Sequence, residues 1–157
     1  MKNAFYLIIF CILVAAGLMA CENTSIEFEG YSSEQVGFLL TADSSKTWQL
    51  QSQAIDGQQQ QIDGCQQYLQ LKFEIKRTED GTDSLASRRV SPVDGCAEDI
   101  IFSGNWQVVA GPQVDTLFFQ VNEMLLPRFI TSLTSQQLEY YYLENDSRIT
   151  ETLVAID

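Results

Sequence analysis

The chain has 157 residues, with 21 acidic side chains against nine basic ones, no histidine and a formal net charge of −12. This length suits a single domain. The negative charge repels phosphate backbones and so excludes nucleic acid as a partner, and the lack of histidine removes the commonest general base and metal ligand near neutral pH.

The first 20 residues are typical of an export signal. Lys2 precedes an unbroken apolar stretch from Ala4 to Ala20, which ends in Leu-Met-Ala before Cys21. A positive start, an apolar core and small residues before a cleavage site define such signals. A transmembrane anchor is the alternative, because this stretch is just long enough to span a bilayer. The ending resembles the bacterial lipobox, which implies cleavage before Cys21, lipidation of its sulfur and stable anchoring by several acyl chains.

Cleavage decides how the four cysteines are used. The exported chain keeps 137 residues and, having lost Lys2, a formal charge of −13. Cys11 leaves with the signal and Cys21 carries lipid, so Cys65 and Cys96 remain. A zinc site needs four ligands and a redox pair stands as Cys-x-x-Cys, which two cysteines 31 positions apart do not match. We therefore predict a disulfide, as expected of two cysteines in an oxidising compartment.

A polar tether, residues 21–31, leads to one short predicted helix. Ser32 and Gln35 fit a Ser-x-x-Gln capping box, and apolar side chains within 36–40 share one helical face. The helix is expected to end near Asp43.

Beyond the helix, the apolar period becomes two, which predicts β-strands separated by turns. We expect a bend or break at Gly104, and Pro127 at the entrance of a strand. With eight short strands and no long helix, the predicted fold is an all-β, eight-stranded up-and-down barrel, and a two-sheet sandwich is the alternative. The predicted strands are 47–54, 68–75, 87–90, 99–110, 114–122, 128–134, 137–144 and 148–156.

The large apolar side chains fit two roles equally well. The interior of an eight-stranded barrel is either filled by side chains or holds one small ligand. The candidate residues for a core or a ligand pocket are Trp48, Leu69, Leu71, Phe73, Trp106, Leu117, Phe119 and Tyr140. In the run 140–142, Tyr140 and Tyr142 must face one side of the strand and Tyr141 the other, either for packing or as an exposed patch for a partner.

No catalytic, cofactor or metal site is predicted. The chain has no nucleophile motif, no phosphate-binding glycine loop and no dinucleotide fingerprint. One acidic region could in principle attract calcium, but its spacing matches no calcium loop, so a solvated loop is favoured. Its residues are Asp80, Asp83, Asp94, Glu98 and Asp99.

Several motifs in order resemble the lipocalin-like domains of small exported lipoproteins in some Gram-negative bacteria. They are Thr47-Trp48 after a short helix, Cys65 before "LKF", Gly104-Asn105-Trp106, and "ITSLT" at 130–134. The resemblance covers about residues 36–156, within a predicted barrel domain at 32–157. The chain departs from the family at Lys46, where glycine is common, and in the long loop before Cys96. The resemblance implies an up-and-down barrel of the calycin type, and the wider lipocalin group binds small apolar molecules.

These observations predict a non-enzymatic, lipid-anchored protein of the cell envelope that binds a small hydrophobic ligand in its barrel. A filled barrel that serves as a structural or protein-interaction module is the alternative, with a protein partner that the sequence does not identify. Glu22 follows Cys21, without the aspartate that retains lipoproteins in the inner membrane of enteric bacteria. The outer membrane is therefore the expected location, on either its periplasmic face or the cell surface.

The two cysteines stand in matching phrases, "IDGC" at 62–65 and "VDGC" at 93–96. In each phrase, Asp-Gly predicts a turn and the cysteine is expected to open a strand. If another strand lay between those two, their backbones would be about 10 Å apart, which exceeds disulfide reach. The phrases therefore predict either directly adjacent strands or cysteines in flanks that converge at one rim.

Overall fold

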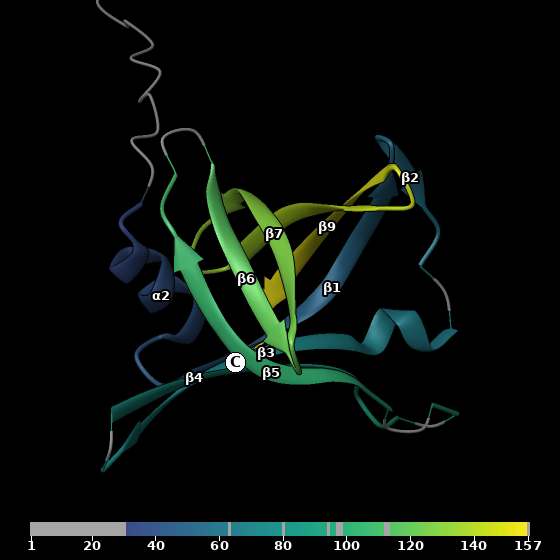
Figure 1. Cartoon of the computed structure of the whole chain (residues 1–157). Helices are drawn as coiled ribbons and strands as arrows, with labels where there is room; N and C mark the ends of the chain where they lie inside the picture. Colours follow the sequence, from purple (N-terminus) through teal and green to yellow (C-terminus); the bar gives the residue numbers. More distant parts are fainter. Residues whose placement is uncertain are drawn as a thin grey trace, which may run out of the picture.

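The computed structural model describes residues 31–62, 64–79, 81–93, 95–96, 99–111 and 114–156 (Figure 1). The predicted signal at 1–20, the lipidation site Cys21 and the tether up to residue 30 lie outside the described residues. In chain order the elements are α2 (Ser33–Thr41), β1 (Ser45–Ile55), β2 (Gln58–Gln60), the 3-10 helix η1 (Gly64–Tyr68), β3 (Leu69–Thr78), β4 (Gly81–Val90), β5 (Asp99–Val109), β6 (Asp115–Val121), β7 (Met124–Leu133), β8 (Gln137–Glu144) and β9 (Ser147–Ala155).

The strands form a closed, antiparallel, eight-stranded up-and-down barrel, as predicted, and not a sandwich. From β3 onward each strand pairs with the next, β1 pairs with β3, and β9 returns to pair with β1 from Ile55↔Ile149 to Trp48↔Ala155. The short β2 pairs with the end of β1 and lies outside the ring. Closure gives every barrel strand two hydrogen-bonded neighbours, which removes the exposed edges of an open sheet.

Alternation along the strands fills the barrel interior. Leu71 and Phe73 of β3 are at most 1 % exposed, and the Phe73 ring packs edge-on against Trp106 at 5.5 Å and stacks on Phe119 at 5.9 Å. All eight residues predicted to form a core or a pocket are buried, with exposed fractions of 0–9 %. Side chains therefore occupy the middle of the barrel.

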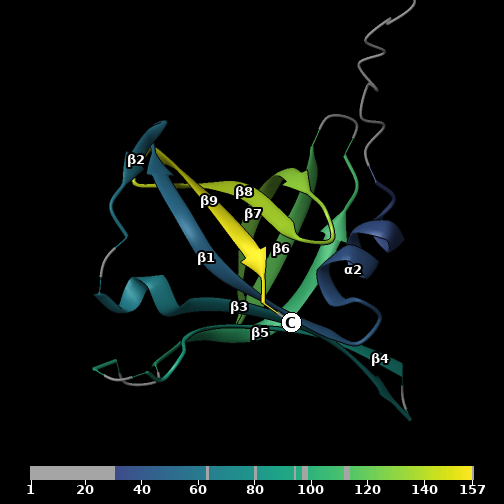
Figure 2. The same cartoon turned by 180° about the vertical axis from the view of Figure 1, so that it is seen from behind.

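Helix α2 covers one end of the barrel. Ser32 and Gln35 form the predicted capping box, and the helix ends at Ala42 in the left-handed region with φ 49°. Val36 and Leu40 are fully buried in the barrel core. Figures 1 and 2 place α2 at the end of the barrel opposite η1. We call these the helix end and the disulfide end, because η1 carries Cys65.

Two predicted strand boundaries were wrong. The region around 81–90 is one ten-residue strand, β4, although only a short strand near 87–90 was expected. Its polar sequence concealed it, because a strand can carry polar side chains wherever both neighbours supply backbone hydrogen bonds. Pro127 lies inside β7 opposite Phe118, and not at the entrance of the strand.

Strand β5 runs without a break through Gly104, where the backbone of β6 passes very close. A Cβ atom built on Gly104 would lie 2.0 Å from the carbonyl oxygen of Gln120. We therefore expect Gly104→Ala to lower the free energy of unfolding by about 1–3 kcal/mol or more, because the two backbones must separate. Urea unfolding measures this. Ser103→Ala, at the exposed neighbouring position, is the control, and equal stability of the two variants would contradict the close approach.

Candidate functional site

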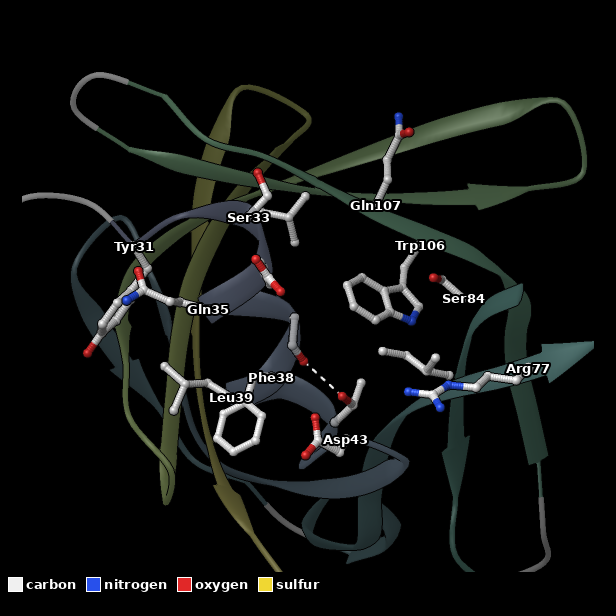
Figure 3. Close-up of a pocket in the computed structure, with 15 residues that line it drawn as sticks. Tyr31, Ser33, Gln35, Phe38, Leu39, Asp43, Arg77, Ser84, Trp106 and Gln107 are labelled. Atoms are coloured by element: carbon white, nitrogen blue, oxygen red, sulfur yellow. Dashed lines mark hydrogen bonds between the residues drawn. The ribbon is translucent and has the colours of Figure 1, made fainter. Parts of the chain in front are cut away.

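A large pocket lies at the helix end, between α2 and strands β3 to β5 (Figure 3). We call it the helix groove, and its volume is about 770 Å³. Trp106, Ile75 and Val108 supply its apolar barrel side, and Phe38 and Leu39 its helix side. Gly37 faces the tryptophan, since a Cβ there would be 3.8 Å from Trp106 Cη2. That distance is an ordinary van der Waals contact, so the glycine leaves room for about one methyl group beside the indole.

Charged side chains lie around this apolar surface. Figure 3 shows the Arg77 guanidinium pointing into the groove, with Asp43 beside it at the end of α2. The Thr41 hydroxyl also lines the groove, but it donates to the Gly37 carbonyl oxygen at 2.8 Å. The groove therefore combines an apolar floor with an ionic rim, an arrangement common in small-molecule sites.

Lys46 fastens the helix that forms one wall of the groove. Its buried ammonium group donates to the carbonyl oxygens of Leu39 and Ser135, and lies 4.4 Å from the ring centroid of Trp48. Trp48 Nε1 in turn donates to the Leu40 carbonyl oxygen at 3.1 Å. A cation at the carboxyl end of a helix also interacts favourably with the helix dipole. The lysine that departs from the family pattern thus holds α2 against the barrel.

A second polar feature, centred on Glu151 of β9, crosses the barrel interior. Arg88 of β4 donates from Nη2 to Glu151 Oε1 at 2.7 Å and from Nη1 to Oε2 at 3.0 Å. Tyr140 and Tyr142 donate to the same carboxylate at 2.6 and 3.4 Å, and Gln53 donates at 3.1 Å. Because Glu151 is fully buried, these five donor contacts replace its hydration. We call these residues the interior network.

The charges and hydrogen bonds of its partners keep the Glu151 carboxylate ionised. Burial alone would raise the pKa of Glu151, but the charge and hydrogen bonds of Arg88, with the Tyr140 hydroxyl, lower it below its ordinary value. Burial and the Glu151 charge raise the pKa of Tyr142 to about 12, and that of Tyr140 well above its usual value. Both phenols are therefore neutral donors at any physiological pH.

Arg128 of β7 adds a second cation to this region. Its guanidinium carbon lies 3.8 Å from the Tyr142 ring centroid, and its positive charge helps to lower the pKa of Glu151. Nη1 donates to the Pro127 carbonyl oxygen at 2.9 Å, and Nε is buried without a hydrogen-bond partner among the described residues. Arg88 therefore binds the Glu151 carboxylate directly, and Arg128 acts on it through its charge.

The remaining predicted residues fall in different places. Cys65 and Cys96 form the predicted disulfide, with Cα atoms 5.5 Å apart. Tyr140 and Tyr142 point inward, whereas Tyr141 stacks on Phe129 at 4.9 Å and against Arg148 at 3.9 Å on the outside. Of the eight core or pocket candidates, Trp106 lines the helix groove, and Leu69 lines a smaller pocket at the disulfide end.

The structure describes two of the five residues of the predicted acidic region. Asp80, Asp94 and Glu98 lie outside the described residues, and Asp83 and Asp99 are exposed. Among the residues that the structure places, no group of three or more potential ligands comes together. Within the same residues, no helix is long and apolar enough to cross a membrane.

Sequence reasoning missed the interior network. A signal was present in the last strand, where the alternation that turns Leu153 inward also turns Glu151 inward. Arg88 gave no comparable signal, because only a short strand near 87–90 was expected and the polar sequence of β4 shows no clear apolar alternation. A bulge between Leu50 and Ser52 of β1 shifts the alternation there and lets Gln53 reach Glu151.

Comparison with known proteins adds no relative. No protein-family model, no curated protein and no solved structure matches the chain. The likeness to exported lipocalin-like domains therefore depends on the motifs and on the fold, since a closed up-and-down barrel with one short preceding helix is compatible with a lipocalin-like binding module.

Proposed function

We propose that the chain is a non-enzymatic, lipid-anchored, lipocalin-like protein of the outer membrane that binds a small apolar molecule in the helix groove. The observation that carries this proposal is the groove itself, with its volume of about 770 Å³ and its floor built on Trp106. This volume lies within the range of small-molecule sites. Because side chains fill the middle of the barrel, the ligand lies at the helix end and not along the barrel axis.

The anchor rests on the Leu-Met-Ala-Cys ending and the preceding apolar stretch. Tyr31, the first described residue, lies at the helix end and lines the groove, so the described part of the chain begins beside the proposed ligand site. Labelled palmitate should enter the wild-type protein and not Cys21→Ser. Equal labelling of both proteins would exclude this anchor.

Energy transfer from tryptophan tests the groove. N-phenyl-1-naphthylamine, a neutral apolar dye, is titrated into protein purified with Cys21→Ser to prevent lipid attachment. We expect saturable transfer from tryptophan to the dye at one dye per chain. Because transfer depends on distance, Trp106, which lines the groove, and Trp48, which donates to the Leu40 carbonyl oxygen of α2, should both contribute to the signal, and binding is read from its saturation.

A matched pair of substitutions on β4 locates the dye. Ser84 lines the groove, so the larger side chain of Ser84→Leu should occupy part of it. Overpacking costs about 1–3 kcal/mol, so we expect dye binding to weaken at least about fivefold. Ser87, on the same strand, does not line the groove, and Ser87→Leu should bind the dye like the parent. Absence of saturable binding, or equal effects of the two leucines, would reject the ligand hypothesis.

A filled-barrel interaction module is the second candidate function. The observation that favours it is a set of apolar side chains, 52–67 % exposed, at the disulfide end of the barrel. They come from the start of β5, the β6–β7 hairpin and β8, and are Ile100, Ile101, Met124, Leu125 and Leu143. Exposed apolar side chains that lie close together are typical of contact surfaces, and these belong to strand ends and a hairpin on one end of the barrel. Failure of the dye titration would favour this function.

A further inference from the structure

A second pocket lies at the disulfide end, distinct from the helix groove. Its volume is about 280 Å³. Leu50, Leu69 and Val90 form its apolar walls, and Cys65 of η1 lies at its edge. The disulfide ties this edge to the β4–β5 connection through Cys96. The pocket therefore has apolar walls, and the disulfide bond fixes one of its edges.

The polar part of this pocket belongs to the interior network. Arg88 and Gln53 both line it. Arg88 donates once from Nη1 and once from Nη2 to Glu151, which uses two of the five N–H groups of a guanidinium. Its side chain keeps 12 % exposure, whereas Glu151 has none. The pocket thus meets the donor side of the ion pair, and not the carboxylate.

The local charge also favours an anion. Glu151, the counterion of Arg88, is fully buried and does not line the pocket, whereas the Arg88 side chain does. Hydrogen bonds from a guanidinium to an anion are about twice as strong as those between neutral groups. Among the side chains that line the pocket, Arg88 is the one that carries a charge, so the pocket offers charged donors and no carboxylate.

We propose that this pocket binds a small aliphatic carboxylate, with its charged group on Arg88 and its chain against Leu50, Leu69 and Val90. At ~30 Å³ per water-sized group, the pocket holds about nine such groups. A chain of about eight carbons matches that size. The rim residue Ile101, 52 % exposed, lies where the end of the chain leaves the pocket.

Calorimetric titration of the Cys21→Ser protein with octanoate tests this proposal. We expect saturable binding of one octanoate per chain, with octan-1-ol at least about tenfold weaker and octylammonium not bound, because only the carboxylate accepts from Arg88. Arg88→Lys keeps a cation beside Glu151 but loses the fork, so it should weaken octanoate at least about fivefold. Its melting temperature verifies that the variant is folded.

Two neighbouring isoleucines give a control that leaves the interior network intact. Ile101→Trp should fill the pocket from its rim and weaken octanoate at least about tenfold. Ile100→Trp, at a more exposed position that does not line the pocket, should bind like the parent. Equal binding of octan-1-ol and octanoate, or equal effects of the two tryptophans, would overturn the proposal.

The variant Ser84→Leu distinguishes the two proposed binding sites. Ser84→Leu should leave octanoate binding unchanged, because Ser84 lies at the helix end. If Ser84→Leu abolishes octanoate binding, the carboxylate binds in the helix groove and the pocket beside Arg88 is not its site. Failure of dye binding in the groove has no effect on the octanoate result, so each proposal can fail alone.

Discussion

Glu151→Gln is expected to lower the free energy of unfolding by about 3–5 kcal/mol. The amide keeps the size of the side chain and still accepts from Tyr140. It removes the negative charge, however, and leaves the Arg88 guanidinium mostly buried without its counterion. Denaturant unfolding of the variant and the parent gives the difference directly.

The control removes both charges together. Arg88→Met/Glu151→Gln leaves no unpaired ion in the interior. It should therefore be more stable than Glu151→Gln alone, even though it also loses the hydrogen bonds of Arg88. Completing the cycle with Arg88→Met gives the coupling energy of the pair. If the double variant loses as much as the two single variants added together, Arg88 and Glu151 do not stabilise one another.

The same pair contributes to the acid sensitivity of the barrel. The pKa of Glu151 is lower in the folded state than its ordinary value of 4.5. Its contribution to stability is therefore complete above the unfolded pKa and is lost as the pH falls through the folded pKa. Between pH 6 and pH 3, the parent should lose more stability than Arg88→Met/Glu151→Gln, because the double variant lacks this titration.

Strands with a clean apolar alternation could be predicted from the sequence. In β3, inward Leu71 and Phe73 alternate with outward Lys72 and Glu74, which form an ion pair at 3.1 Å. The helix was equally predictable, because a capping box is a local interaction between Ser32 and Gln35. In both cases, the physical cause lies within a few neighbouring residues.

Features that depend on distant partners could not be predicted. A polar strand such as β4 is held by β3 and β5, and its inward Arg88 is acceptable only because Glu151, 63 positions away, meets it. The helix groove arises in the same way. It lies between α2 and β3 to β5, where Gly37 faces Trp106, and no local pattern in the sequence indicates that these residues come together. Tertiary pairing is what turns these residues into a site.

The disulfide shows how the two Asp-Gly-Cys phrases are used. Strand β4 lies between β3 and β5, so the strands that follow the two cysteines are not adjacent. Neither cysteine opens a strand, contrary to expectation. Cys65 lies in η1, and Cys96 pairs with Val93 in a turn before β5. Of the two predicted arrangements, the converging flanks are correct, and they bring the Cα atoms to 5.5 Å.

Removing this bond should cost about 3–4 kcal/mol, because the bond closes a loop of 31 residues in the unfolded chain. We expect Cys65→Ser/Cys96→Ser to unfold at correspondingly lower denaturant concentration, and a reducing agent to lower the stability of the parent but not of the variant. The loss should be local as well. Amide exchange should rise in η1, which holds the edge of the pocket beside Arg88, and change little in α2 at the other end. An unchanged unfolding midpoint would show that the native contacts of η1 with β1 and β4 suffice to hold this margin without the covalent bond.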